Sequence, residues 1–392
     1  MSLKGLPNFD NTELAFRHLS DRDLKRGRVL FELLSRPWLV DVGSLFARLA
    51  LALRIPIGWA IRPTVYAQFC GGETIEESEE TVELLYKNRV RTILDYSAEG
   101  VTSEEELDSN CSEILATIDA AREDPRHAFS VFKPSGLSLK GLLSKSTDDF
   151  TIKEEEEWER VLRRIRTICQ ATSDAGGKVL IDAEESWLQD NIDEIAEDMM
   201  SDYNRESVIV YTTVQLYRID RLKYLKNLCI KARECGFKIG VKLVRGAYME
   251  KERAMAIKNG CPLPIQPNKE ATDRDFDNAI RFCLDNLDAI HIFAGTHNAE
   301  STLMLCKEMS ERGIENDDPR ISFSQLLGMS DQISFNLAAH GYNIAKYVPY
   351  GPIREAIPYL IRRAKENTSI EGQTSRELSL IDKELKRRKK LI

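Results

Sequence analysis

The alternation of hydrophobic and polar positions changes character near residue 86 of this 392-residue chain. From residue 11 to about residue 85, apolar residues recur at the three- and four-residue spacing that predicts amphipathic helices. Asn11 and Ser20 precede such stretches, and both belong to the residue types that cap helix N-termini. We therefore expect residues 1–85 to form a helical arm that packs on the rest of the chain.

Beyond residue 86, short runs rich in β-branched and aromatic residues alternate with longer stretches of helical periodicity. Near-continuous apolar runs separated by helices indicate parallel strands that are buried on both faces. The runs are Arg91–Tyr96, His127–Phe132, Lys178–Asp182, Val208–Thr212, Lys238–Val244, Ala289–Phe293, Arg320–Phe323 and Asn343–Tyr347. Eight runs in succession favour a closed barrel over an open sheet. The predicted fold class is α/β, a TIM-type (β/α)8 barrel over residues 86–392.

The most apolar early stretch, Val42 to Ile61, contains Arg48, Arg54 and Pro56. A membrane-spanning helix needs about 20 mostly apolar residues, so this stretch is too interrupted to span a membrane. We interpret it as a buried helix, with a position against a membrane surface as the alternative. The basic tail from Lys383 to Lys390 is most simply the charged end of a helix or a frayed terminus, and membrane contact is again the alternative.

Composition narrows the classes of function. The net charge of −8 argues against a general nucleic-acid binder. The 8 cysteines are scattered without a C-x-x-C pair and there are only 5 histidines, so structural disulfides and a zinc site have no support. The segment from Met1 to Asp10 lacks the pattern of a signal peptide. These features favour a globular protein of a reducing, cytoplasm-like compartment.

Polar or ionisable residues follow the predicted strands at their C-terminal ends, the rim that carries the active site in a (β/α)8 barrel. The rim residues are Asp95, Tyr96, Lys133, Asp182, Glu184, Glu185, Gln215, Lys242, Arg245, Gly246, Ala247, Tyr248, Thr296, His297, Asn298, Gln325, Leu326 and Tyr347. Any single charge in a loop is usually just solvated. Lys133 and Lys242 differ, because each lies at or inside an apolar strand, and a buried ammonium requires a counter-charge or a bound anion.

The helix predicted after the last strand contains Tyr359, Arg362 and Arg363, spaced i, i+3 and i+4. This spacing places the three side chains on one helix face. Because guanidinium groups bind carboxylates in a bidentate manner, the arginine pair is a candidate carboxylate clamp. In isolation, a solvated pair, or one that pairs with Glu366, would be the simpler interpretation. The other rim residues shift the balance towards the clamp.

Nucleotide and nucleophile motifs are missing from the chain. It has no G-x-G-x-x-G after a strand and no G-x-x-x-x-G-K-[ST], so a Rossmann-bound NAD and a P-loop nucleotide are unsupported. It also has no serine nucleophile elbow. His297, within Thr-His-Asn, is open to three interpretations: a base, a structural residue or a cofactor contact.

At the rim residues the chain closely resembles the proline dehydrogenase family. The matching segments are VFKPSG around Lys133, LIDAEES around Asp182, YTTVQLY around Gln215, VKLVRGAYMEKER from Val241, FAGTHN from Phe293, FSQLLGMSDQIS from Phe323 and YVPYGPIREAIPYLIRRAKEN from Tyr347. The resemblance covers about residues 60–370. The last two segments resemble the stand-alone, monofunctional, eukaryotic-type branch of the family.

This resemblance implies a distorted barrel that holds FAD at the strand ends and oxidises L-proline to 1-pyrroline-5-carboxylate, the first step of proline catabolism. It implies hydride transfer from substrate C5 to flavin N5, and electron transfer from there to a membrane quinone. The residues implied to contact FAD are Asp182, Gln215, Lys242, Arg245, Gly246, Ala247, Tyr248, Thr296, His297, Asn298, Gln325, Arg363 and Glu366. Those implied to bind the substrate are Lys133, Leu326, Tyr347, Tyr359, Arg362 and Arg363, with Asp182, Lys242 and Lys133 as the catalytic set. Some relatives carry Arg at the Lys242 position, which leaves its hydrogen bonds open.

The resemblance also implies a preference for proline, because relatives that prefer hydroxyproline carry a smaller residue where this chain has Tyr347. Three alternatives stay open. The substrate is hydroxyproline or another cyclic imino acid; the barrel is catalytically silent and binds an amino acid or a partner protein; or a metal-dependent lyase uses Asp182, Glu184 and Glu185. The expected location is a bacterial cytoplasm or the inner-membrane surface, or a mitochondrion if the chain is a trimmed eukaryotic one.

Overall fold

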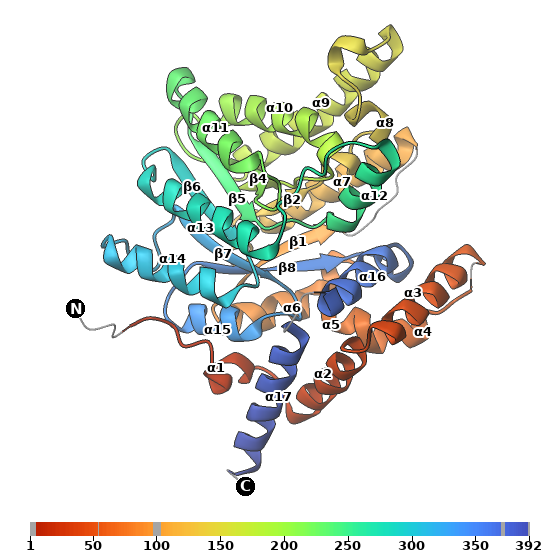
Figure 1. The fold of residues 1–392 in the computed structure, drawn as a ribbon, viewed down its shortest axis with the longest axis vertical. Helices are drawn as coiled ribbons and strands as arrows, with labels where there is room; N and C mark the ends of the chain where they lie inside the picture. Colours follow the sequence, from red (N-terminus) through yellow and green to blue (C-terminus); the bar gives the residue numbers. More distant parts are fainter. Residues whose placement is uncertain (1–4, 54, 97–102, 370–372, 391–392) are drawn as a thin grey trace. The chain divides into compact units, whose positions relative to one another are not determined.

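The computed structural model describes residues 5–53, 55–96, 103–369 and 373–390 (Figure 1). Part of the segment from Met1 to Asp10, and Arg54 of the early apolar stretch, therefore lie outside the described residues. The chain divides into two compact units. Unit 1 contains residues 1–99 and 325–392, and unit 2 contains residues 100–324. The expected boundary between arm and barrel at residue 85 stays a prediction.

The strands belong to one parallel sheet with the order β1-β8-β7-β6-β5-β4-β3-β2. They are β1 (Arg91–Tyr96), β2 (Ser130–Phe132), β3 (Val179–Ile181), β4 (Val210–Gln215), β5 (Ile239–Val244), β6 (Ile290–Gly295), β7 (Ile321–Leu326) and β8 (Ile344–Tyr350). Neighbours in the sheet are neighbours in sequence, except that β8 pairs with β1. This cyclic order, with helices between the strands, is that of a (β/α)8 barrel, so the predicted fold class is confirmed.

Each predicted apolar run overlaps one strand, but the ends of the strands differ from the predicted ends. β2 and β3 are shorter than expected, whereas β4 continues to Gln215 and β8 to Tyr350. Tyr347, expected at the end of its strand, therefore lies inside β8. The apolar pattern records which residues are buried, and it does not record where the ladder of backbone hydrogen bonds stops.

Unit 2 alternates strands with long helices that lie along them; α10, α11 and α13 beside β4, β5 and β6 are visible in Figure 1. Its helices are α7 (Glu104–Ala121), α8 (Lys140–Leu143), α9 (Ile152–Asp174), α10 (Ser186–Tyr203), α11 (Arg221–Cys235), α12 (Met249–Asn259), α13 (Lys269–Asp285) and α14 (Ala299–Glu311). Ser103 and Thr151 begin α7 and α9 with capping boxes, which satisfy backbone N–H groups at the helix starts. Gly240 of β5 pairs with Tyr211 of β4. A Cβ on Gly240 would lie 2.5 Å from the Tyr211 ring, so this position has no room for a side chain.

Unit 1 combines β1 and β8 with helices from both ends of the chain. The helices are α1 (Thr12–Phe16), α2 (Asp21–Leu34), α3 (Pro37–Ala52), α4 (Gly58–Ile61), α5 (Ala67–Phe69), α6 (Ile75–Lys87), α15 (Asp331–Ala339), α16 (Ile353–Ser369) and α17 (Gln373–Lys389). Asn11 caps α1 and Ser20 caps α2, as predicted. Buried side chains of α2, α16 and α17 share one apolar core, which includes Phe31, Leu360 and Ile381.

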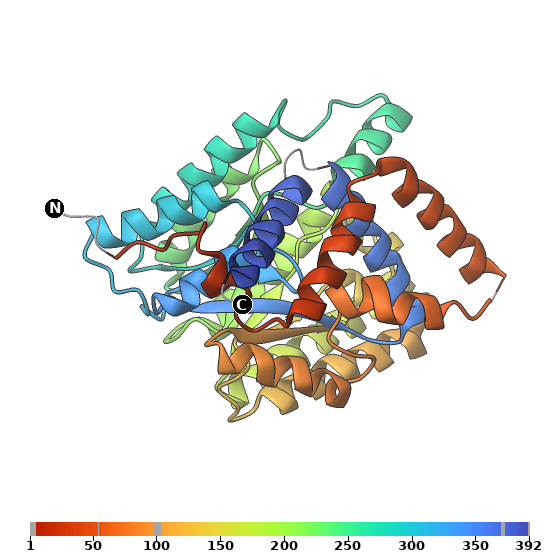
Figure 2. The same ribbon diagram turned by 90° about the horizontal axis from the view of Figure 1, so that it is seen from below.

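The interpretation of the early apolar stretch as a buried helix is wrong. Val40 and Ser44 of α3 are buried, but Val42, Leu45 and Phe46 are exposed. Helix α3 stands at the edge of unit 1, so only one of its faces has neighbours there (Figure 2). Apolar residues all round a helix do not guarantee burial, because burial also needs an element on each side.

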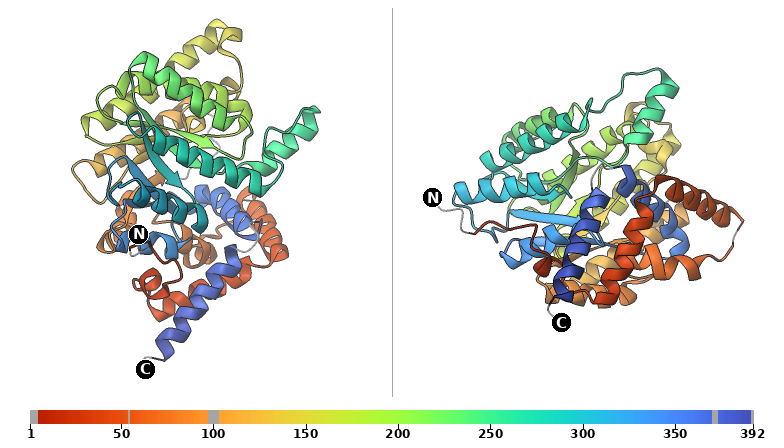
Figure 3. Two further views of the ribbon diagram at one scale, coloured as in Figure 1. Left: turned by 60° about the vertical axis from the view of Figure 1, so that its left-hand side comes forward. Right: turned by 60° about the horizontal axis from the view of Figure 1, so that its bottom comes forward.

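The basic tail is the charged end of α17, as its simplest interpretation held. Arg387 and Arg388 both bond the buried carboxylate of Glu384, and Arg388 also contacts Asp21 at 2.9 Å. Lys383 Nζ donates a hydrogen bond to the Asp10 backbone oxygen at 2.8 Å. Figure 3 shows α17 beside α1 and α2, so these cations connect the two ends of the chain.

A buried network of charges holds the loop after β7 in unit 1. Lys346 Nζ lies 2.7 Å from Asp331 Oδ1 and donates hydrogen bonds to the backbone oxygens of Leu326 and Met329. Burial opposes ionisation of Asp331, but Lys346 and His18 together outweigh it and hold the pKa of Asp331 well below its usual range. Glu377 of α17 accepts a hydrogen bond from Ser330 N at 2.8 Å, and burial raises the pKa of Glu377 to about 7.

Glu377→Gln should stabilise the protein at pH 8 and have little effect at pH 5. The pKa of Glu377 is about 7 in the folded chain, against about 4.3 in an unfolded one. Between these values the folded state binds the extra proton, so stability falls as pH rises and the whole penalty is present above pH 7. Gln cannot ionise, so the variant should gain about 3–4 kcal/mol at pH 8, at about 1.4 kcal/mol per pKa unit. Thermal unfolding midpoints at both pH values measure the difference.

Glu384→Gln is the matched control on the same helix. Burial opposes ionisation of Glu384, but Arg387 and Arg388 lower its pKa to about 2, so its folded-state pKa is depressed. The stability that this carboxylate contributes is present above the unfolded pKa, and its removal should lower the midpoint at pH 8. Equal midpoint shifts of Glu377→Gln at pH 5 and pH 8 would contradict the assignment.

Candidate functional site

Asp182 lies between two lysines at the strand ends of unit 2. Lys242 Nζ, on β5, donates a hydrogen bond to Asp182 Oδ1 at 2.6 Å, and Lys133 Nζ lies 3.8 Å from Asp182 Oδ2. The Lys242 side chain is almost fully buried, whereas 27% of the Lys133 side chain is exposed. One carboxylate therefore faces two ammonium groups. These ammonium groups suit an anionic ligand and disfavour a further cation nearby.

Arg245, directly after β5, is held on several sides. Its guanidinium donates to Asp273 Oδ1 and Thr296 Oγ1 at 2.6 Å and to Ser301 Oγ at 2.8 Å. Its Cζ also lies 4.3 Å from the centre of the Phe276 ring. These contacts fix the orientation of the guanidinium plane. The sequence predicted Arg245 and Thr296 but not Asp273 or Ser301, which lie on helices where no motif marks them.

The turn after Arg245 depends on glycine. Gly246 has φ of +145°, and a Cβ there would lie 2.2 Å from the Tyr217 ring. The next residue, Ala247, donates its N–H to Gln215 Oε1 at 3.2 Å, and Gln215 Nε2 donates to the Glu184 backbone oxygen at 2.7 Å. Helix α12 then starts with no side-chain cap at Tyr248. This start is a place where backbone N–H groups can bind an anion.

The Thr296-His297-Asn298 segment connects β6 to α14. Asn298 caps α14 by accepting hydrogen bonds from Glu300 N and Ser301 N. Thr296 Oγ1 accepts from Asn298 N at 3.1 Å as well as from Arg245. His297 lies between them and is half-buried. The segment is thus built as a rigid helix start, and its contacts with FAD stay a prediction.

Glu184 is a buried carboxylate that connects two strand ends. It accepts hydrogen bonds from Ser135 N at 2.8 Å and Ser135 Oγ at 2.5 Å. Burial raises the pKa of Glu184 even though these hydrogen bonds oppose the rise. Glu185, next in the chain, pairs instead with Lys251 of α12. Within the described residues no three His, Cys, Asp or Glu side chains are placed to hold a metal ion.

In unit 1, helix α16 presents the predicted pair of arginines over a tyrosine. Arg362 Cζ and Arg363 Cζ lie 5.9 and 5.2 Å from the centre of the Tyr359 ring, so the shared face is confirmed. Arg363 also forms a double contact with Glu366, at 2.5 and 2.6 Å. The Tyr359 hydroxyl is buried and has no hydrogen-bond partner among the described atoms, and burial raises the pKa of Tyr359.

The remaining predicted residues of unit 1 lie on or next to β7 and β8. Tyr347 is buried within β8, and its backbone oxygen accepts from Leu327 N at 2.8 Å. Leu326 packs against the apolar core that contains Tyr359. Gln325 Oε1 accepts a hydrogen bond from Ser334 Oγ at 2.8 Å. Each unit therefore brings its own share of the predicted residues together.

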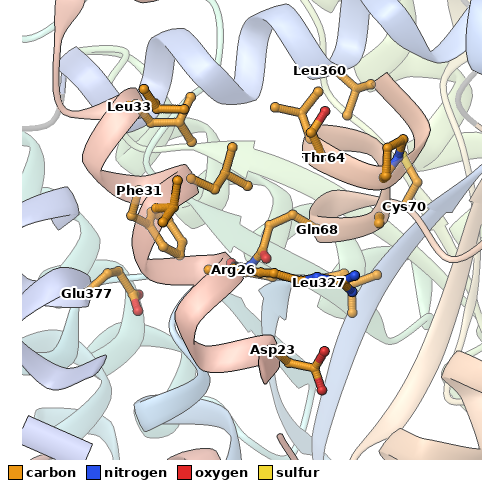
Figure 4. A pocket seen from close by; sticks show the side chains of 18 of the residues that line it. Asp23, Arg26, Phe31, Leu33, Thr64, Gln68, Cys70, Leu327, Leu360 and Glu377 are labelled. Carbon is orange, nitrogen blue, oxygen red and sulfur yellow. Dashed lines mark hydrogen bonds between the residues drawn. The ribbon is translucent and has the colours of Figure 1, made fainter. Parts of the chain in front are cut away.

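A cavity of about 1380 Å³ lies elsewhere in unit 1. Figure 4 shows its mostly apolar wall, with Phe31, Leu33 and Leu360 among the lining side chains and Glu377 at one end. None of the predicted site residues lines it. Its size therefore gives no reason to move the candidate site from the strand ends.

Comparison with known proteins identifies the family. The family model described as "Proline dehydrogenase" matches residues 78–376. The chain belongs to the proline dehydrogenase family. The predicted resemblance is thereby confirmed, and the protein is an oxidoreductase.

Individual relatives agree with the family. "Proline dehydrogenase 1, mitochondrial" of Dictyostelium discoideum is 32% identical over 391 residues, covering 88% of this chain and 68% of the relative. "Carbapenem antibiotics biosynthesis protein CarD" of Pectobacterium carotovorum is 32% identical over 322 residues, covering 82% and 83%. "Hydroxyproline dehydrogenase" of Xenopus laevis is 29% identical over 412 residues, covering 95% and 88%.

Among solved structures, proline utilization A from Bdellovibrio bacteriovorus, inactivated by N-propargylglycine, superposes with a TM-score of 0.75 at 19% identity. The match covers 92% of this chain and 41% of the solved chain. This chain thus spans about two fifths of that chain's length. At this identity the likeness establishes the fold.

Gly246→Ala should destabilise the protein more than Gly260→Ala. Both glycines have positive φ, +145° and +63°, and a left-handed backbone alone costs a non-glycine residue on the order of 1 kcal/mol. A Cβ at residue 246 also strikes the Tyr217 ring, whereas nothing lies within 4 Å of one at residue 260. Thermal unfolding midpoints compare the two variants, and equal losses would show that the turn tolerates a side chain.

Proposed function

We propose that this protein catalyses the FAD-dependent oxidation of L-proline to 1-pyrroline-5-carboxylate and passes the electrons to a membrane quinone. The observation that carries the proposal is the Lys133–Asp182–Lys242 cluster at the strand ends of a chain in the proline dehydrogenase family. The cluster supplies two partly buried ammonium groups, as a site for an amino-acid carboxylate and an anionic cofactor should.

The residues of unit 2 fit a dinucleotide with an anionic diphosphate. Arg245 supplies a fixed guanidinium, the uncapped start of α12 supplies backbone N–H groups, and Lys242 supplies a buried ammonium. No side chain accepts hydride, so oxidation of a C–H bond requires the acceptor that bound FAD supplies. The residues proposed to hold FAD are Asp182, Gln215, Lys242, Arg245, Gly246, Ala247, Tyr248, Thr296, His297, Asn298, Gln325, Arg363 and Glu366.

The lysine cluster is proposed to favour the neutral, deprotonated form of the substrate amine. A secondary amine releases hydride only in its neutral form. The ammonium groups of Lys133 and Lys242 disfavour an ammonium nearby and so favour loss of the amine proton. Asp182 keeps Lys242 in place by their hydrogen bond and prevents an uncompensated buried charge.

The arginines of α16 are proposed to bind the substrate carboxylate. Glu366 orients Arg363, and both guanidinium groups lie over the Tyr359 ring in cation–π contacts. Leu326, Tyr347 and Tyr359 then supply the apolar wall for the ring carbons of the substrate. Binding at both ends of proline orients its C5 for reaction.

Hydroxyproline is the second candidate substrate, because a hydroxyproline dehydrogenase is among the relatives. The bulk of Tyr347 favours proline, since its ring leaves less room for a C4 hydroxyl. A silent barrel that binds an amino acid or a partner is the non-enzyme alternative. Several relatives are named as mitochondrial, so a mitochondrial location is proposed beside a bacterial cytoplasmic one. Among the described residues, no helix is both long and apolar enough to cross a bilayer.

Anaerobic addition of L-proline to the purified, flavin-loaded protein tests the reaction. We expect the flavin absorbance band to bleach, and to bleach at least about 10-fold faster with proline than with hydroxyproline at equal sub-saturating concentration. A faster reaction with hydroxyproline would reverse the substrate assignment. If no flavin binds even after FAD is added, the silent barrel becomes the better description.

Arg362→Ala should raise KM for proline strongly. Loss of a charge-assisted contact with the carboxylate costs about 1.5–3 kcal/mol, so kcat/KM should fall roughly 10- to 150-fold. Arg354→Ala is the control, because Arg354 is an exposed arginine of the same helix that donates to the Leu51 backbone oxygen. Steady-state kinetics of both variants decide the matter, and an unchanged KM for Arg362→Ala would rule out the clamp.

A further inference from the structure

Helix α3 carries a row of exposed hydrophobic side chains. Val42, Leu45, Phe46 and Leu49 are 60%, 62%, 63% and 52% exposed. Together with Trp38 and Leu53 they fall within an arc of about 100° on the helix surface, given 3.6 residues per turn. They form one continuous apolar face.

This face points outward because the opposite face of α3 is attached to unit 1. Val40 and Ser44 are buried there. Arg354 of α16 donates to the Leu51 backbone oxygen at 3.2 Å, and Lys365 of α16 lies 3.8 Å from Asp41. In Figures 2 and 3 none of the other described elements of unit 1 lies on the outer side of α3. The helix is therefore held with its apolar face uncovered.

The neighbouring segments enlarge the apolar face. Nineteen large hydrophobic side chains are exposed in the described part of the chain, and ten of them lie between residues 29 and 59. They include Val29 and Leu33 at the end of α2 and Trp59 of α4, which is 82% exposed. Such a concentration on one surface marks an interaction site, whereas scattered apolar residues need no explanation.

The charges in and around α3 indicate what the apolar face binds. From Val29 of α2 to Ile61 of α4 the chain contains three arginines and two acidic residues, Glu32 and Asp41, so this segment has a net charge of +1 in a chain of −8. The three are Arg36, Arg48 and Arg54. Trp38 and Trp59 stand towards the two ends of the apolar stretch. An apolar helix face that lies in a segment with more arginines than acidic residues, with a tryptophan towards each end, has the chemistry of a helix that lies in a membrane interface.

A second copy of the chain fits the surface less well. A symmetric contact between two copies would place the same positively charged segment against itself, and like charges at an interface oppose association. An anionic lipid surface complements these arginines. The basic end of α17 is a weaker candidate for such contact, because Arg387 and Arg388 already bond Glu384.

We propose that the end of α2 together with α3 and α4, the docking surface, binds an anionic lipid bilayer. Helix α3 then lies parallel to the membrane plane, with Leu45, Phe46 and Leu49 among the acyl chains and Arg48 at the headgroups. The inference goes beyond the proposed oxidation of proline, and it does not depend on that reaction.

Vesicle flotation of the full chain tests the docking surface. We expect the protein to float with phosphatidylcholine vesicles that contain phosphatidylglycerol, and more weakly with phosphatidylcholine alone. Phe46→Ser with Leu49→Ser should reduce partitioning at least about 10-fold, because two apolar side chains lose their burial. The control pairs Ile152→Ser with Ile257→Ser, two residues that are 78% and 84% exposed elsewhere, and it should float like the wild type.

A position-specific readout complements flotation. Brominated lipids should quench the fluorescence of Trp38 and Trp59, and the quenching should disappear when both are replaced by Phe. Arg48→Gln should reduce the preference for anionic vesicles. The proposal would be overturned if the wild type floated with neither kind of vesicle. It would also be overturned if the control variant lost as much vesicle binding as the variant with Phe46→Ser and Leu49→Ser. Self-association that the Phe46 and Leu49 substitutions abolish, without vesicle binding, would assign the surface to a second copy instead.

Discussion

The ammonium of Lys242 inside a parallel strand is the constraint on which the candidate site depends. A buried cation without a partner would cost several kcal/mol, and Asp182, 2.6 Å away, meets this requirement. Lys133 lies 3.8 Å from the same carboxylate and also interacts with the buried Glu184. Two ammonium groups thus lie together at the strand ends of unit 2. The proposed chemistry, from carboxylate binding to loss of the amine proton, uses these groups.

Lys346 of unit 1 shows how the same fold treats a lysine with a structural role. Its ammonium faces Asp331 at 2.7 Å and two backbone oxygens, so its charge and its donors are satisfied. Burial distinguishes neither lysine, because both lie inside strands with little exposure. Their surroundings distinguish them. Lys242 shares Asp182 with a second lysine, Lys133, whereas Lys346 lies with Asp331 and Glu377 beneath the loop after β7.

Much of the fold was accessible from the sequence, because eight apolar runs and the caps at Asn11 and Ser20 are local signals. The face shared by Tyr359 and its two arginines was accessible for the same reason. Partners distant in sequence were not: nothing near Asp273 or Ser135 marks them as contacts of Arg245 or Glu184. The exposure of α3 was missed because a hydrophobic pattern reports which face is apolar and not whether another element covers it.

The two units differ in the number of chain segments that form them. Unit 2 is the continuous stretch 100–324, whereas unit 1 joins residues 1–99 to residues 325–392 through the β1–β8 pairing and the contacts of α17 with α1 and α2. During synthesis on a ribosome, unit 2 can therefore fold while residues 1–99 still lack residues 325–392, which complete unit 1. The N-terminal helices, with the exposed face of α3, remain incomplete until the last helix has left the exit tunnel. A chaperone or a lipid surface that shields them would act in that interval.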